Sequence, residues 1–309
     1  MSDPYQASAE VASTVSREGL QPENLANPAG LDGIEFIEYS TSQPQALGQV
    51  LELIGFHPIA RHRSREVVLY RQGDMNIVVN AHNAAGSTDD TPAPPAIAAV
   101  AFRVRDASWA YRRAVERGAW SVATHVEVME LNIPAIHGVG ATRIYFVDRY
   151  REFSIYSVDF VPIPNVEQKP PAVAGLHWFG LVQYVGLGRL DAWAEFYHEI
   201  LGFTPLPDDE RFGILPKGKI LKSPSGNIYL QLIAPEPGIP YLVGDERLQR
   251  IGFGTANVPE AARALRARGV EFYSSENVHV EEKGALTRAW LGGVMFELVR
   301  DPRAAGKPG

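Results

Sequence analysis

The chain has 309 residues, 45% hydrophobic and 21% charged, which is typical of a globular protein long enough for two domains. Its formal net charge of −7 argues against a nucleic-acid partner, because no excess of Lys and Arg is available to neutralise phosphates. Without cysteine there are no disulfides or thiolate metal sites, and no apolar run is long enough to span a membrane. The N-terminus lacks a secretory signal pattern, so we expect a cytoplasmic protein.

The two ends and the middle of the chain are expected to be irregular. Residues 1–31 are polar, small and turn-rich, which predicts a flexible arm, and residues 302–309 are expected to form a similar tail. The Pro-rich stretch 161–175 predicts a linker. It separates an N-terminal domain, 32–160, from a C-terminal domain, 176–301.

One order of elements repeats four times between these ends. Each copy starts with an apolar strand-like run, continues with a helical pattern that ends at glycine, and closes with short strand-like runs. Each copy is roughly 50–70 residues long and has the order β-α-β-β-β. Four such copies predict an α+β protein. In the second copy, FSIYSVDF (153–160) is predicted as a closing strand. The four opening strands are GIEFIEYS (33–40), AIAAVAFRV (96–104), LHWFGLVQYV (176–185) and RLQRIGFGTANV (247–258).

Paired units of this kind resemble the vicinal oxygen chelate superfamily, whose glyoxalase-like fold is an open curved sheet. Two pairs in one chain resemble the 4-hydroxyphenylpyruvate dioxygenase family, over about residues 32–301. The motifs that carry the likeness include LELIGFHPIARHRSREVVLYRQGDMNIVVN, VAFRVRDASWAYRRAVERGA, GRLDAWAEFYHEILGF and GGVMFELVRD. The resemblance implies two domains, each a pair of modules, with a structural N-terminal domain and an active-site cup in the C-terminal one.

The resemblance also implies a metal site in that cup, made of two histidines and one glutamate around Fe(II). The motif GGVMFELV places the glutamate on Glu297. The second histidine closes a Gln-His pair before an apolar strand and falls on Arg250. The first falls on Gly180, or on Leu181 in an alternative alignment, and neither side chain binds a metal. Only one of the three ligands is therefore retained.

Two residues on the same strand are weak substitutes for the missing ligands. His177 and Gln183 both have the strand parity of Leu181, and related folds use amide oxygens as ligands. Each has a simpler role as an ordinary strand residue. The sequence therefore favours no metal cofactor, and Fe(II) is expected only if the family chemistry is retained.

An arginine in a ligand position changes the chemistry of the cup. A guanidinium is always charged and cannot coordinate Fe(II). Beside Glu297, Arg250 would form a charge-assisted pair that takes the place of the metal. The alternative is that Arg250 points to solvent at the strand end. We favour the ion pair, and we predict Arg250 and Glu297 as the catalytic residues of the cup.

Four further residues are predicted to bind the substrate. Strand parity and the resemblance place Gln231 near the ligand, and Arg288 and Ser223 are added as polar groups of neighbouring segments. Gln183 completes the set. For each of them the alternative is an ordinary structural contact, such as a bond to a neighbouring strand or an exposed strand position.

Three function classes stay open. The first is a metal-independent enzyme acting on a small, aromatic carboxylate or 2-oxo acid by isomerase, lyase or cyclase chemistry, which needs only positioning and acid–base groups. The second is an Fe(II) dioxygenase of the 4-hydroxyphenylpyruvate type with unusual ligands. The third is a non-catalytic small-molecule binding protein. The first is favoured because of the ligand losses, and exposed sheet edges favour a homo-oligomer.

Overall fold

The computed structural model describes residues 26–81, 93–123, 131–151, 153–207, 218–235, 246–273 and 282–306. Residues 1–25 of the predicted arm lie outside this part of the chain. Of the helices that are described, none is long and apolar enough to cross a membrane. The helices are α2 (Pro44–Ile54), α3 (Ala107–Glu116), α4 (Tyr156–Asp159), α5 (Leu190–Leu201) and α6 (Val258–Arg266), with 3-10 helices η1 (Val139–Ala141), η2 (Val173–Gly175) and η3 (Pro302–Gly306).

The strands form two mixed sheets. The N-terminal sheet has the order β6-β7-β5-β1-β4-β3-β2-β8, and the C-terminal sheet has the order β10-β11-β12-β9-β13-β15-β14. The N-terminal strands are β1 (Leu31–Ser40), β2 (His57–His62), β3 (Val67–Gln72), β4 (Met75–Asn80), β5 (Ala96–Val104), β6 (Ala135–His137), β7 (Arg143–Val147) and β8 (Phe160–Pro162). The C-terminal strands are β9 (His177–Tyr184), β10 (Thr204–Pro205), β11 (Lys219–Lys222), β12 (Tyr229–Ile233), β13 (Arg247–Thr255), β14 (Gly284–Leu286) and β15 (Phe296–Arg300).

Both sheets are built around the opening strands of their two modules. β1 lies antiparallel to β5, and β9 lies antiparallel to β13. On each side the closing strand of a module lies parallel to its own opening strand: β4 to β1, β7 to β5, β12 to β9 and β15 to β13. This arrangement is the α+β fold of paired modules that the sequence predicts.

Local sequence signals explain where the helices begin and end. α3 starts after Asp106, whose side chain accepts a hydrogen bond from the Trp109 N–H at 2.8 Å. α6 starts in the same way after Asn257. α2 and α5 end at Gly55 and Gly202, which have φ of 108° and 77° and so use the left-handed conformation that glycine adopts without strain.

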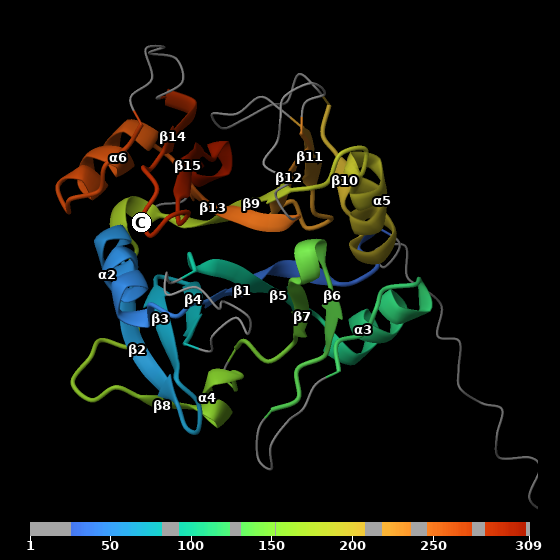
Figure 1. Ribbon diagram of the computed structural model, residues 1–309, viewed down its shortest axis with the longest axis horizontal. Coiled ribbons are helices and arrows are strands. Elements are labelled where there is room, and N and C mark those ends of the chain that lie inside the picture. The colour runs from blue at the N-terminus through green and yellow to red at the C-terminus, as the bar shows by residue number, and fades with distance from the viewer. Residues whose placement is uncertain are drawn as a thin grey trace, which may run out of the picture.

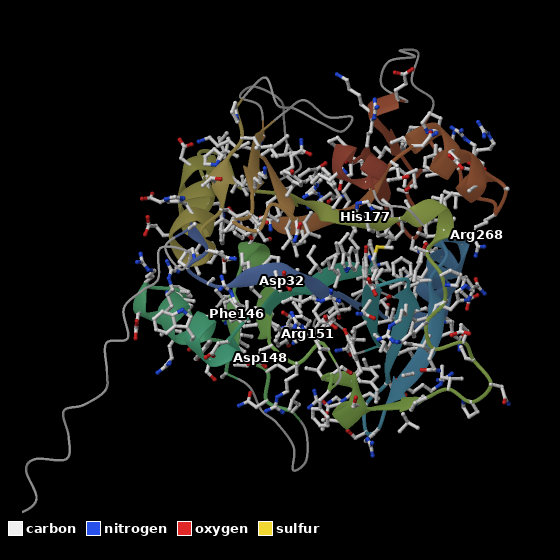
Figure 2. The ribbon with its side chains drawn as sticks, turned by 180° about the vertical axis from the view of Figure 1, so that it is seen from behind. Asp32, Phe146, Asp148, Arg151, His177 and Arg268 are labelled. Atoms are coloured by element: carbon white, nitrogen blue, oxygen red, sulfur yellow. The ribbon has the colours of Figure 1, made fainter. Side chains whose placement is uncertain are left out.

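The main hydrophobic core lies between the two sheets and contains residues of both. The Phe56 ring after α2 lies 6.5 Å from the Trp178 ring and 5.9 Å from the Phe253 ring of the C-terminal sheet. α3 and α5 lie on one flank of the molecule, and α2 and α6 lie on the other (Figure 1). Beside α2 lies Arg268 (Figure 2), which donates hydrogen bonds to the carbonyls of the last helical turn at 2.8 and 3.0 Å.

The structure corrects three predictions about irregular and extended segments. FSIYSVDF is not a strand throughout, because Tyr156–Asp159 forms the helical turn α4 and only Phe160 onward is extended. A short apolar run does not by its pattern distinguish a strand from a helical turn, and here the adjacent residues Ile155 and Tyr156 are both buried. β8 also reaches two residues into the predicted linker. In the predicted arm, Ala29 is buried and Asn27 is bonded to the backbone of Leu31 in both directions.

Candidate ligand cup on the C-terminal sheet

The face of the C-terminal sheet that points away from the core carries the residues implied by the resemblance. Strand register places Glu297 of β15 beside Gly252 of β13, Gly252 beside Gly180 of β9, and Gly180 beside Tyr229 of β12. Residues in register on adjacent strands share a face. Gly252 and Gly180 have no side chains, so a hollow is left between Glu297 and Tyr229 on this face of the sheet.

Arg250 and Glu297 form the ion pair that the sequence predicts. Arg250 lies two residues before Gly252 on β13, and its Nε donates to Glu297 Oε2 at 2.9 Å. The two side chains are only 1% and 4% exposed. A charge pair so far from water is strong only because each charge neutralises the other. Arg250 Nη2 is buried and has no hydrogen-bond partner in the described part of the chain.

The donor set of this cup does not fit an Fe(II) ion. The three ligand positions implied by the resemblance hold a carboxylate, a guanidinium and no side chain at all, in Glu297, Arg250 and Gly180. A Cβ atom at Gly180 would lie 2.1 Å from the carbonyl oxygen of Tyr229, so the backbone itself leaves no room for a histidine. No group of three or more His, Cys, Asp or Glu that could hold a metal occurs among the described residues.

Two stacked aromatic rings line the cup beside the ion pair. The Phe179 and Tyr229 rings lie 4.7 Å apart at 20°. The Arg303 guanidinium lies 5.2 Å from the centre of the Tyr229 ring, a distance typical of a cation–π contact. Arg303 belongs to η3, in the segment predicted to be a flexible tail. The short 3-10 helix therefore brings a cation to the edge of the cup.

Asp301 holds that helix in place. Its carboxylate accepts hydrogen bonds from Arg303 at 2.8 and 2.9 Å, and it lies 2.9 Å from His177 Nε2. Burial by itself would raise the pKa of Asp301, but the hydrogen bonds from Arg303 and His177 outweigh it and lower the pKa to about 2. His177, seen on β9 in Figure 2, is thus engaged with Asp301 and is no substitute metal ligand.

The open space left in the cup is small. A void of about 30 Å³ lies among Glu297, Gly252, Gln231 and the Phe179–Tyr229 stack. This volume holds about two water molecules. Gln231 therefore lines the same void as Glu297, and an aromatic ring fits only if the walls, which include the Phe179–Tyr229 stack, move apart.

Gln183 is not in the cup. It is buried against α5, where its Nε2 donates to the Tyr197 hydroxyl at 2.7 Å. Its neighbours in register, Leu248 and Leu232, belong to the core between the sheets. Side chains alternate along a strand, so three residues after Gly180 the side chain points to the opposite face. Its predicted role as a ligand-binding or metal-binding residue is therefore corrected.

Arg288 and Ser223 also lie outside the cup. Arg288 is 62% exposed and pairs with Glu271 at 3.5 Å. Ser223 is buried in the turn between β11 and β12, where its hydroxyl accepts a hydrogen bond from the Ile228 N–H at 3.1 Å. A serine that closes a turn in this way has a structural role. Both placements correct the prediction that these residues bind substrate.

The sequence interpretation did not identify Tyr229 and Arg303 as cup residues. Tyr229 was accessible to prediction, because it lies two residues before Gln231 and therefore shares its face. No local signal points to Arg303. Its position depends on the contact between η3 and Asp301, which brings the end of the chain back to the sheet.

Comparison with known proteins gives two family matches. Residues 25–161 match the model for the N-terminal part of hydroxyphenylpyruvate dioxygenase. Residues 176–303 match the glyoxalase/bleomycin resistance protein/dioxygenase superfamily.

Similar full-length proteins agree with these matches. Hemolysin VllY of Vibrio vulnificus is 33% identical over 270 residues, which is 83% of this chain and 76% of that protein. The 4-hydroxyphenylpyruvate dioxygenase of Pseudomonas aeruginosa is 32% identical over 269 residues, 83% of this chain and 75% of that protein. A solved mutant of 4-hydroxymandelate synthase from Streptomyces coelicolor shares the fold, with a TM-score of 0.68 at 18% identity, covering 88% and 93% of the two chains.

Proposed function

Because this chain belongs to the 4-hydroxyphenylpyruvate dioxygenase family, we propose that it uses the family's cup without iron, on a small aromatic carboxylate or 2-oxo acid. The observation that carries the proposal is the Arg250–Glu297 pair, which puts a cation where the family implies a metal ligand. Gly180 supports it, because Tyr229 leaves no room there for a donor side chain.

The same pair supplies the groups that metal-free chemistry needs. Arg250 is the cation that would hold the carboxylate of the ligand, and its Nη2 is available for a second bond. Once the ligand takes up this cation, Glu297 is released from the pair. Its carboxylate then removes a proton from the carbon next to the keto group; the C–H electron pair forms a C=C bond and the carbonyl π electrons move to oxygen, which gives an enolate. The Glu297 carboxylic acid returns the proton to that oxygen, and the enol is complete. Overall this is an isomerisation that uses no oxidant.

Entry of such a ligand requires the cup to open. The void of about 30 Å³ is too small for an aromatic ring, and the Phe179–Tyr229 stack forms its wall. Separation of these two rings would join the void to the outside. The cation of Arg303 at the Tyr229 ring would then lie close to the entering acid.

Iron binding is the first test. The purified protein is reconstituted anaerobically with Fe(II), desalted and analysed for iron, beside an iron-binding member of the family treated in parallel. We expect far less than one iron per chain, because of the three ligand positions implied by the resemblance only Glu297 holds a side chain that can coordinate a metal. Tight one-to-one iron in this protein would overturn the proposal.

Proton exchange is the second test. In D2O, NMR follows the exchange of hydrogen for deuterium next to the keto group of 4-hydroxyphenylpyruvate. We expect the protein to accelerate exchange over the background, and Glu297→Gln to remove the acceleration while the acid still binds. Binding without acceleration would instead assign a non-catalytic binding protein, the alternative left open by the sequence.

A further inference from the structure

The outer face of the N-terminal sheet has a floor built for a ligand. Register places Ala99 of β5 between Glu38 of β1 and Arg143 of β7. One step along, Ala101 lies in the same way between Phe36 and Tyr145, whose rings are 5.8 Å apart. The small alanines form the floor, and the larger side chains of β1 and β7 stand on both sides of it. The sheet therefore carries a concave face.

A buried carboxylate is fixed on this floor. Glu38 is 6% exposed, and its Oε1 accepts hydrogen bonds from Arg143 Nη2 at 2.9 Å and from Asn80 Nδ2 at 3.0 Å. Both bonds go to the same oxygen. Glu38 Oε2 accepts no hydrogen bond from the described residues. It is also not fully enclosed by protein atoms. An acceptor fixed in this way can accept a hydrogen bond from a hydroxyl group of a ligand.

The space above the floor is a cavity of about 250 Å³, far larger than the void of the C-terminal cup. It lies just below the roughly 300 Å³ at which drug-sized pockets begin, so it suits a compact ligand. Its walls combine polar groups with aromatic rings, and Phe36, Tyr145, Tyr156 and Phe160 are among them. Such walls favour a ring.

A cation stands at the exposed side of the same cavity. Arg65 lines it and is exposed, whereas Glu38 is buried. Burial raises the pKa of Tyr145, Glu38 raises it further, and Arg143 and Arg65 oppose the increase. All three charges therefore act on the Tyr145 hydroxyl, and the Arg143 guanidinium lies 5.6 Å from the centre of the Tyr145 ring. The cavity has an acceptor in its depth and a cation at its mouth.

We propose that this cavity is a second ligand site, for a small ring-containing acid that also carries a hydroxyl group. The hydroxyl donates to Glu38 Oε2, the ring packs along Phe36 and Tyr145, and the carboxylate lies by Arg65. The site does not depend on the function proposed for the C-terminal cup, since it uses other strands and other charges. The N-terminal half is then a binding unit, beyond the structural role implied by the resemblance.

Three probes test the chemistry of this site. They are 4-hydroxybenzoate, benzoate without the hydroxyl, and phenol without the carboxylate, each titrated into the full-length protein. Methyl NMR reports the location, because Ile133 and Ile155 line the N-terminal cavity while Ile220 and Val299 line the C-terminal cup. We expect 4-hydroxybenzoate to bind most tightly of the three and to shift the first pair of methyl groups.

Two variants divide the recognition into its parts. Glu38→Gln should weaken 4-hydroxybenzoate and phenol by at least about tenfold, because the fixed charged acceptor is lost, and should leave benzoate unchanged or tighter. Arg65→Gln should weaken both acids and leave phenol unchanged. Arg65 is exposed, so this variant keeps its fold even if Glu38→Gln does not. Glu195→Gln, an exposed change of the same kind on α5, is the matched control.

Three results would overturn the proposal. The first is no binding of any probe at about 10 mM, roughly tenfold above the ~1 mM dissociation constant of a weak small ligand. The second is a shift of the Ile220 and Val299 methyl groups in place of Ile133 and Ile155. The third is equal weakening of all probes by Arg65→Gln and by Glu195→Gln, which would show that the cation at the mouth has no specific role.

Discussion

Breaking the buried ion pair should cost far more than breaking a surface pair of the same length. Arg250 and Glu297 lie 2.9 Å apart and are 1% and 4% exposed. Arg250→Met removes the cation that pairs with a carboxylate away from water, and Glu297→Leu removes the anion that pairs with a buried guanidinium, so each should lower the free energy of unfolding by about 3–5 kcal/mol. The double variant removes both charges of the pair and should be within about 1 kcal/mol of the natural protein, or more stable.

The chain contains a matched control for this experiment. Arg117 and Glu199 also lie 2.9 Å apart, but they are 47% and 50% exposed, so removing either should cost less than about 1 kcal/mol. Urea unfolding, followed by circular dichroism and tryptophan fluorescence, measures all the variants. If Arg250→Met and Glu297→Leu cost no more than the surface changes, the pair is hydrated and does not replace a metal in a dry site.

Two more predictions follow from the same region. Gly180→Ala should destabilise the protein by about 1–3 kcal/mol in urea unfolding, because the added Cβ would lie 2.1 Å from a backbone oxygen. Gly252→Ala is the control and should be tolerated, because the nearest atom to its Cβ would be 3.5 Å away. Equal effects of the two changes would contradict the close approach at Gly180. Asp301 has a lowered pKa of about 2, so its stabilisation is present above the unfolded value near 4 and is lost as the pH falls from about 4 to 2. Asp301→Asn should therefore cost about 1–2 kcal/mol at pH 7, after allowance for solvent screening, and much less at pH 2, and a cost independent of pH would contradict this.

The sequence alone was sufficient for most of the fold and for one half of the cup. Periodicity and glycine stops predict the four modules, because each module must bury one face of its own strands and helix. Glu297 and Arg250 were identified from the ligand positions that the resemblance implies, and the structure places them in contact. Self-association and the cytoplasmic location stay predictions.

The positions that failed depend on strand register. When Leu181 is taken as the ligand position in place of Gly180, the predicted face of every β9 side chain is reversed. That choice placed Gln183 in the cup, whereas its side chain belongs to the core. Arg288 and Ser223 were chosen for their chemistry, but pairing and turn geometry give them other partners. A carboxylate inside an apolar strand, the pattern that surrounds Glu297, was also present in GIEFIEYS at Glu38 and was overlooked.

By itself, the sequence determined that a glycine and an arginine occupy two of the three ligand positions implied by the resemblance, and neither side chain coordinates a metal. Only the tertiary structure decided what these positions contact. Whether Arg250 meets Glu297 or solvent depends on how β13 and β15 align, and whether Glu38 reaches Arg143 depends on the alanine between them on β5. These contacts join residues 47 and 105 positions apart in the chain, so sheet pairing, and no local preference, brings them together.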